Sequence, residues 1–421
     1  MRKKEIFEEI VDIMKHDSAS CKDKKGADPA GYGASITEDM TDREFVFLVS
    51  SYLASFGLTG HLNFKKKKFG RLPFRVLRYR DELYVVEALE ESPLKVGDRV
   101  VKVDGDSVKD YGELHKEFLH DESEERQGRH WNSLLCFAEQ LTYVSAVTQT
   151  TINYRIDLKE YEDFQPKYEC RVLADGIMFI RLADFVNESE IQQMYADNAE
   201  LLKTSKYLII DVRNNDGGSD TAFLPLLQYC LPNGKTLDET ATNDDGACSD
   251  GMEINYSKRN CAMRMKVLKE YLQMDVPEDT RKILTAMRQE LMEKNGKGFC
   301  HEADEGMDIP IVGDSSVEKV YIITDSGCAS SGDNFVYVFG MLPKVTVVGR
   351  PTMGILDYSN VACVEFEDYE LSYPTSRLLA LDKGKGMMKK GVAVDQYIPW
   401  TPKHLKKDVD LEYILEQLEE A

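Results

Sequence analysis

The residues best suited to covalent chemistry lie in segment 324–335, TDSGCASSGDNF, which contains Ser330 and Ser331. The segment lies between the apolar runs 320–323 and 335–339, a pattern that predicts a buried strand, a turn of small residues and a helix. A serine in such a turn lies beside backbone N–H groups and a helix N-terminus, which stabilise negative charge on a reacting group. The sequence therefore predicts that Ser330 is a nucleophile.

A second turn that could serve such a site is 214–218, NNDGG, directly after the continuous apolar run 207–212. Glycine lets the backbone approach another group closely, so Gly217 and Gly218 could line a reaction site. Taken alone, the pair is more typical of an ordinary turn between a strand and a helix.

Strands and helices alternate from residue 176 onward, which predicts an α/β core with crossover connections. We expect strands at 177–180, 207–212 and 320–323, and helices at 188–202, 221–229 and 335–339. A polar insertion at 232–315, with an amphipathic helix at 278–294, interrupts this core. The insertion is either a packed surface excursion or a lid over the site.

The chain before this core divides into two patterns. Residues 1–60 show helical periodicity, whereas 64–114 read as short strands with Gly-Asp and Asp-Gly turns in 94–108. The latter stretch resembles part of the PDZ domain, which binds extended peptides at a sheet edge, and a plain small β domain is the alternative. The predicted parts are a helical block at 1–63, a PDZ-like domain at 64–115, a connecting helix and strand at 116–165, and the core at 166–421.

Composition restricts the function classes. A chain of 421 residues predicts two or three domains, and a net charge of −21 argues against a nucleic-acid partner. The nine cysteines are scattered without a CxxC pair, which predicts neither a disulfide framework nor a zinc site. No run approaches the roughly 20 apolar residues of a membrane span, and no secretory leader is evident. We therefore expect a cytoplasmic protein.

Four segments in order, 177–185, 208–218, 320–335 and 348–360, resemble the family S41 serine peptidases of the C-terminal-processing and tricorn types. This resemblance implies a crossover α/β core of the ClpP/crotonase kind, with an inserted PDZ-like domain, and it requires no metal or cofactor. It implies that Ser330 is the nucleophile. It also implies that the N–H of Ser331 and that of Gly217 or Gly218 form the oxyanion hole.

The general base departs from one branch of the family. In the C-terminal-processing branch a lysine occupies the position that is Ile355 here, and isoleucine cannot accept a proton. The tricorn-like branch uses a histidine from before the PDZ-like domain, and His61, after Gly60, occupies that place. Histidine titrates near pH 6.5, which suits a general base. A lone loop histidine is otherwise most often exposed polar surface.

The acid that would orient His61 is harder to assign. Where the tricorn-like branch has a glutamate, this chain has methionines, Met387 and Met388. We take Asp357 as the substitute, with an exposed turn aspartate as the alternative. We expect Asp333, three residues beyond the serine, to be a structural partner at the helix start.

The resemblance thus implies a serine endopeptidase that forms an acyl-enzyme on Ser330 with His61 as base. Its partner would be a polypeptide held at the PDZ-like edge, through its C-terminus, with no nucleic acid involved. The alternative, prompted by the missing lysine and glutamate, is an inactive pseudopeptidase that binds peptides without cleaving them.

Overall fold

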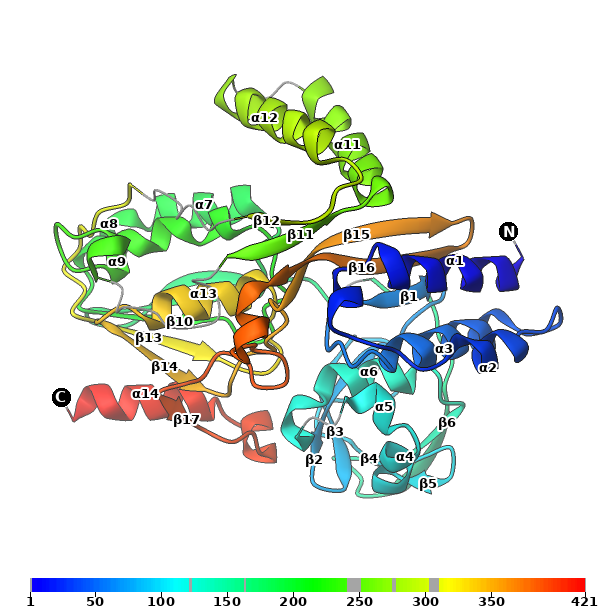
Figure 1. Cartoon of the computed structure of the whole chain (residues 1–421). Coiled ribbons are helices and arrows are strands. Elements are labelled where there is room, and N and C mark those ends of the chain that lie inside the picture. The colour runs from blue at the N-terminus through cyan, green and yellow to red at the C-terminus, as the bar shows by residue number, and fades with distance from the viewer. Residues whose placement is uncertain are drawn as a thin grey trace. The chain divides into compact units, whose positions relative to one another are not determined.

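The computed structural model describes residues 2–120, 123–162, 164–240, 251–274, 278–302 and 310–420, and Figure 1 labels its elements. Two parts of the predicted insertion, 241–250 and 303–309, therefore lie outside the described residues. The chain forms two compact units. The N-terminal unit comprises Met1–Lys68, Asp245–Met307 and Leu356–Gly386, and the core unit comprises Phe69–Asp244, Asp308–Ile355 and Met387–Ala421.

A six-stranded sheet forms the centre of the core unit, in the order β17-β14-β13-β10-β9-β8. All neighbouring strands pair in parallel except β8, which is antiparallel to β9. The strands are β8 (Tyr168–Ala174), β9 (Ile177–Leu182), β10 (Tyr207–Asp211), β13 (Lys319–Thr324), β14 (Val345–Gly349) and β17 (Gln396–Tyr397). Their parallel register brings the carboxyl ends of β10, β13 and β14 to one edge, where loops carry functional groups.

Both faces of this sheet are buried, which explains the continuous apolar runs of the strands. On one face, alternate side chains such as Ile210 and Ile322 pack with Phe335 of α13 (Ser331–Gly340). On the other, Ile209 and Ile323 pack with residues of α14 (Val409–Glu419). The predicted α/β fold is confirmed.

Two predicted helices of the core unit are broken. The helix expected at 188–202 is α7 (Glu188–Asp197) and α8 (Ala199–Thr204), which are separated at Asn198. The helix expected at 221–229 is two 3₁₀ turns, η3 (Asp220–Ala222) and η4 (Leu224–Leu226), followed by α9 (Leu227–Cys230). Pro225 explains the second case, because it lacks the N–H that a helix interior needs.

A second six-stranded sheet in the core unit forms an antiparallel β domain, ordered β2-β3-β4-β6-β7 with β5 paired to β4. Its buried Trp131 lies on α6. The elements are β2 (Phe74–Tyr79), β3 (Glu82–Ala88), β4 (Arg99–Val103), β5 (Asp106–Ser107), α4 (Val108–Leu114), α5 (Lys116–Leu119), η2 (Glu124–Arg126), α6 (Gly128–Leu135), β6 (Gln140–Val144) and β7 (Thr151–Arg155).

The N-terminal unit combines helices with a five-stranded sheet, ordered β1-β16-β11-β12 with β15 paired to β16. The strands are β1 (Asn63–Lys66), β11 (Met252–Tyr256), β12 (Gly298–Glu302), β15 (Tyr358–Phe366) and β16 (Tyr369–Leu378). The helices are α1 (Lys3–His16), α2 (Pro29–Ala34), α3 (Asp42–Ala54), α11 (Lys258–Gln273) and α12 (Glu278–Lys294). The described part of the insertion thus supplies two strands to this sheet and the helical hairpin α11–α12 seen in Figure 1.

The remaining short elements connect these parts: η1 (Ala19–Lys22), α10 (Leu237–Thr240), η5 (Leu379–Lys383) and η6 (Pro402–Leu405). Within the described ranges, the longest helices fall short of the length and apolarity that a membrane crossing requires.

Candidate active site

Ser330 lies at the sharp turn between β13 and α13. Its backbone has φ 58° and ψ −121°, a region that side-chain-bearing residues rarely adopt. Such strain persists only where the surrounding structure imposes it, and it is concentrated at functional sites. The turn leaves Ser330 half-buried at the first turn of α13, beside the N–H groups of a helix N-terminus.

The buried carboxylate of Asp333 holds this turn in place. Its Oδ2 accepts the N–H of Ser330 (2.8 Å) and that of Ile355 (3.0 Å), and its Oδ1 accepts the N–H of Gly354 (2.7 Å). Burial raises the pKa of Asp333, although its hydrogen bonds oppose that shift. Asp333 therefore joins the Ser330 turn to the loop after β14.

The turn after β10 lies directly against Ser330. A Cβ added to Gly217 would lie 2.7 Å from the Ser330 Cβ, so a side chain at 217 would collide with the serine. The Ala329 N–H donates to the carbonyl of Asn215 (2.8 Å), and the Ser331 hydroxyl donates to the carbonyl of Gly218 (2.7 Å). The structure thus brings together Ser330, Ser331 and the glycine pair that the sequence singled out.

The two glycines differ in what their N–H groups do. The Gly217 N–H donates to the side-chain oxygen of Asn215 (2.8 Å) and is therefore occupied. Phe185 donates to the Gly217 carbonyl and accepts from Ser219, so the intervening Gly218 N–H faces away from Phe185. Among the described residues, Gly218 N–H has no acceptor. Gly218 is therefore the better candidate of the pair for an oxyanion donor, together with Ser331.

His61 lies in the N-terminal unit, just before β1, with φ 59°. Its Nδ1 lies 2.6 Å from the backbone carbonyl of Tyr358. A carbonyl only accepts hydrogen bonds, so Nδ1 carries the proton and Nε2 of the neutral ring has the lone pair. That tautomer is the one a general base needs when it accepts a proton at Nε2.

Asp357 precedes Tyr358 and is buried, with 1% of its surface exposed. Its Oδ2 would lie 2.6 Å from a Cβ added at Gly386, so the chain there leaves room for this carboxylate. The Tyr358 carbonyl was not expected as a partner of His61, because a backbone acceptor has no signature in the sequence.

The β domain contacts the loops that hold Ser330. The Arg126 guanidinium donates to the carbonyls of Thr352 (2.8 Å) and Met353 (2.9 Å), and the Met353 N–H donates to the carbonyl of Cys328 (2.7 Å). Arg129 of α6 donates to the Gly327 carbonyl and pairs with Asp216. The loops on both sides of Ser330 therefore contact η2 and α6.

The described residues contain no group of three or more His, Cys, Asp or Glu side chains placed to hold a metal ion. The candidate groups are a serine with a strained backbone, the N–H groups of Gly218 and Ser331, and a histidine whose Nδ1 is hydrogen-bonded to a backbone carbonyl.

Comparison with known proteins defines the class. The model of peptidase family S41 matches residues 176–398, which is more than half of the chain. This range contains Gly217, Gly218, Ser330, Ser331 and Asp357, and it leaves out His61. The chain belongs to peptidase family S41. It is a serine-type peptidase, a hydrolase whose substrates are polypeptides.

Solved structures show the same fold. Mature CPAF superposes with a TM-score of 0.65 at 14% identity, covering 98% of this chain and 95% of CPAF. Mature CPAF in complex with lactacystin gives the same TM-score and identity, with 99% and 97% covered. A sequence search of curated proteins finds no match.

Proposed function

We propose that the chain is an endopeptidase that forms an acyl-enzyme on Ser330, with His61 as general base. The observation that carries this proposal is the strained turn of Ser330 against Gly218. A serine hydroxyl is a weak nucleophile and needs both a base and donors for the developing oxyanion. The N–H groups of Gly218 and Ser331 supply the donors, and Nε2 of His61 supplies the base, so the assignment follows the histidine-using branch.

The proposed reaction is an acyl transfer that passes through an ester on Ser330. His61 Nε2 takes the Ser330 hydroxyl proton while Oγ bonds to the substrate carbonyl carbon, and the negative charge develops on the carbonyl oxygen facing Gly218 and Ser331. The proton then passes from His61 to the leaving amine as the C–N bond breaks. Water, deprotonated by His61, attacks the ester, and Ser330 leaves with the proton returned to Oγ.

We assign the orientation of the His61 ring to groups in the same compact unit as His61. The Tyr358 carbonyl fixes the Nδ1 tautomer, and we assign the buried Asp357 carboxylate next to it as the group that stabilises the imidazolium formed during the reaction. His61, Asp357 and Tyr358 all belong to the N-terminal unit.

The β domain is proposed as PDZ-like, receiving an extended substrate through its C-terminus. In support, β2 is an edge strand of the sheet, so one of its sides is not paired with another strand of that sheet. Part of that edge is occupied, because the side chain of Asn132 on α6 accepts from the Val76 N–H (2.8 Å) and donates to the Val76 carbonyl (3.3 Å). Peptide addition at Val76 therefore requires Asn132 to leave.

A serine-reactive fluorophosphonate tests the nucleophile and the base. We expect one equivalent on the wild type, located at Ser330 by peptide mass, no labelling of Ser330→Ala, and labelling slowed about 100-fold or more in His61→Ala. Ser189→Ala and His301→Ala remove an exposed serine and an exposed histidine elsewhere and should label normally. A folded wild type that is not labelled would favour the pseudopeptidase, and normal labelling of His61→Ala would remove His61 as the base.

A further inference from the structure

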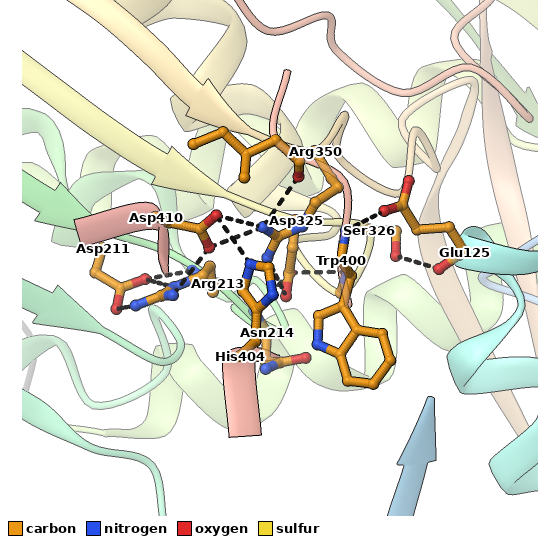
Figure 2. Close-up of polar contacts among 12 residues, drawn as sticks. Glu125, Asp211, Arg213, Asn214, Asp325, Ser326, Arg350, Trp400, His404 and Asp410 are labelled. Atoms are coloured by element: carbon orange, nitrogen blue, oxygen red, sulfur yellow. Dashed lines mark hydrogen bonds and ion pairs between the residues drawn. The ribbon is translucent and has the colours of Figure 1, made fainter. Parts of the chain in front are cut away.

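The carboxyl ends of β10, β13 and β14 carry a partly buried charge network that the mechanism does not use (Figure 2). It joins the turn after each strand to the start of α14. Its members are Asp211, Arg213, Asp325, Arg350, Asp408 and Asp410. The two turns of the proposed active site follow β10 and β13, so the network is connected along the chain to both turns.

Asp325 is the point where the network reaches both turns. Its Oδ1 accepts the N–H of Asn214 at 2.9 Å, in the turn 214–218 that carries the proposed oxyanion donor and is called the oxyanion turn below. The same oxygen accepts the N–H of Gly327 at 2.9 Å, in the turn 325–330 between β13 and α13 that contains Ser330. One carboxylate oxygen therefore binds the backbone of the segment that ends in Gly218 and of the segment that ends in Ser330.

The turns are in direct contact at this point. A Cβ added to Gly327 would lie 2.4 Å from the Asn214 Oδ1 and 3.1 Å from the Asp325 Oδ1. Asn214 itself has φ 57°, an uncommon conformation for a residue with a side chain. Because the turns are in contact here, the two hydrogen bonds of Asp325 contribute to the position of one turn against the other.

Arg350 connects Asp325 to the rest of the network and partly compensates its charge. Arg350 lies between Asp325 and Asp410, with its Nη2 4.0 Å from Asp325 Oδ2 and its Nη1 2.6 Å from Asp410 Oδ1 (Figure 2). Arg213 binds the other oxygen of Asp410 at 3.0 Å and pairs with Asp211 at 2.7 Å. Burial alone would raise the pKa of Asp410, but the His404 hydrogen bond and the two arginines hold it well below its usual range.

We propose that Asp325 is a positioning residue of the peptidase, which fixes the spacing between the Gly218 donor and Ser330 through its hydrogen bonds to Asn214 and Gly327. This inference rests on the proposed function, because the spacing affects catalysis only if Ser330 is the nucleophile and the Gly218 N–H is an oxyanion donor. Asp325 touches neither substrate nor the reacting atoms.

The test measures three quantities of the fluorophosphonate reaction separately: the maximal rate constant of labelling (kinact), the reagent concentration at half that rate (KI), and the fraction of protein that is labelled. Asp325→Ala removes the shared acceptor, so kinact should fall at least about tenfold while KI changes less than about twofold. Asp325→Asn keeps an oxygen that can accept both N–H groups, so its kinact should stay within about threefold of the wild type. Asp325→Ser, with a shorter acceptor, should lie between them and serves if the alanine variant does not fold.

A purely structural role would lower the fraction of protein that labels and leave the kinact of the labelled fraction unchanged. That result would overturn the proposal, as would equal losses in the alanine and asparagine variants. Asp314→Ala is the matched control, since it removes a carboxylate that is 70% exposed and pairs with Lys203. A wild type that is not labelled at Ser330 would instead refute the proposed function. Normal labelling of the wild type with unaltered kinact in Asp325→Ala would refute the positioning role alone.

Discussion

At the scale of single residues, the proposed nucleophile and the proposed base share an unusual backbone. Ser330 has φ 58° and His61 has φ 59°, and neither is glycine. Conformations of this kind cost of order 1–3 kcal/mol each, so they are kept only where the fold or the function requires them. The hydroxyl of Ser330 and the ring of His61 are therefore held in directions that an ordinary loop would not impose.

The oxyanion turn yields the sharpest single-residue prediction. A Cβ at Gly218, which has φ 143°, would lie 2.3 Å from the carbonyl carbon of Phe185, so Gly218→Ala must move the turn. Loss of one oxyanion donor costs about 100- to 1,000-fold in rate, and we expect a loss of that order in fluorophosphonate kinact.

Gly234→Ala is the control for this substitution. Gly234 also has positive φ (73°), but nothing lies within 4 Å of its added Cβ. The control should label at the wild-type rate. If Gly218→Ala also labels at that rate while folded, the Gly218 N–H is not an oxyanion donor.

Residue types and order in the sequence indicated Ser330 and the glycine pair, because a strand, a small-residue turn and a helix have clear patterns. The sequence could not indicate the partners that hold them. The Tyr358 carbonyl at His61 is a backbone group, and Asp325 acts on two N–H groups that are 111 and 2 residues away. Such contacts depend on tertiary proximity, which a single sequence does not display.

At the scale of elements, α6 covers part of the edge at which the β domain is proposed to bind peptides. Asn132 occupies both edge groups of Val76 on β2, and it also donates to the Gly128 carbonyl of its own helix at 2.8 Å. The asparagine thus takes the place that one residue of an added peptide strand would occupy.

Removing this side chain should strengthen peptide binding. In the Ser330→Ala background, Asn132→Ala frees the Val76 groups, and we expect a several-fold lower Kd for a fluorescent peptide with a free C-terminus, measured by anisotropy. Asn153→Ala, on the edge strand β7, is the control and should leave Kd unchanged. Weaker binding in Asn132→Ala would show that peptides do not use the β2 edge at Val76.

We expect the β domain to lose stability in acid because of His130 on α6. Burial, with a smaller contribution from His120, lowers the pKa of His130 to about 3. The unfolded chain has a histidine pKa near 6.5, so between these values the unfolded state binds the extra proton. Stability is therefore highest above the unfolded pKa and falls as the pH drops below it.

The expected loss between pH 7.5 and 5.5 is about 1.4 kcal/mol from this residue. Urea unfolding followed by Trp131 fluorescence in a Trp400→Phe background measures it, since the chain has only these two tryptophans. His130→Phe should remove that part of the pH dependence, whereas His301→Phe, at an exposed position of β12, should not. An unchanged dependence in His130→Phe would show that His130 is protonated in the folded domain.

Two segments show where a local sequence pattern predicts secondary structure correctly and where it fails. The predicted helix at 278–294 coincides with α12, since its apolar residues recur at helical spacing and neither proline nor glycine interrupts it. The segment 221–229 contains Pro225 and folds as 3₁₀ turns, although its apolar content favoured a helix. The domain limits proposed from the sequence stay predictions, as does the cytoplasmic location.

At the scale of the whole molecule, the net charge of −21 should influence which peptides reach the site. Acidic side chains also lie beside the oxyanion turn, where Asp216 and Asp220 flank Gly217 and Gly218 in the chain, and only Asp216 is paired with an arginine among the ion pairs of the described residues. A negative field attracts cationic substrates and repels anionic ones, and salt screens it over about 10 Å at 0.1 M.

We therefore predict opposite salt dependences for two fluorogenic peptides that share one cleavable sequence but carry flanking lysines or flanking glutamates. Between 20 and 500 mM NaCl, kcat/KM should fall several-fold for the lysine peptide and rise for the glutamate peptide. Because the field acts on encounter, kcat at saturation should change little for either. A neutral peptide with the same core separates this effect from any action of salt on the enzyme itself. If both charged peptides follow the neutral one, the charge of the molecule does not steer its substrates, and specificity must come from contacts at the site.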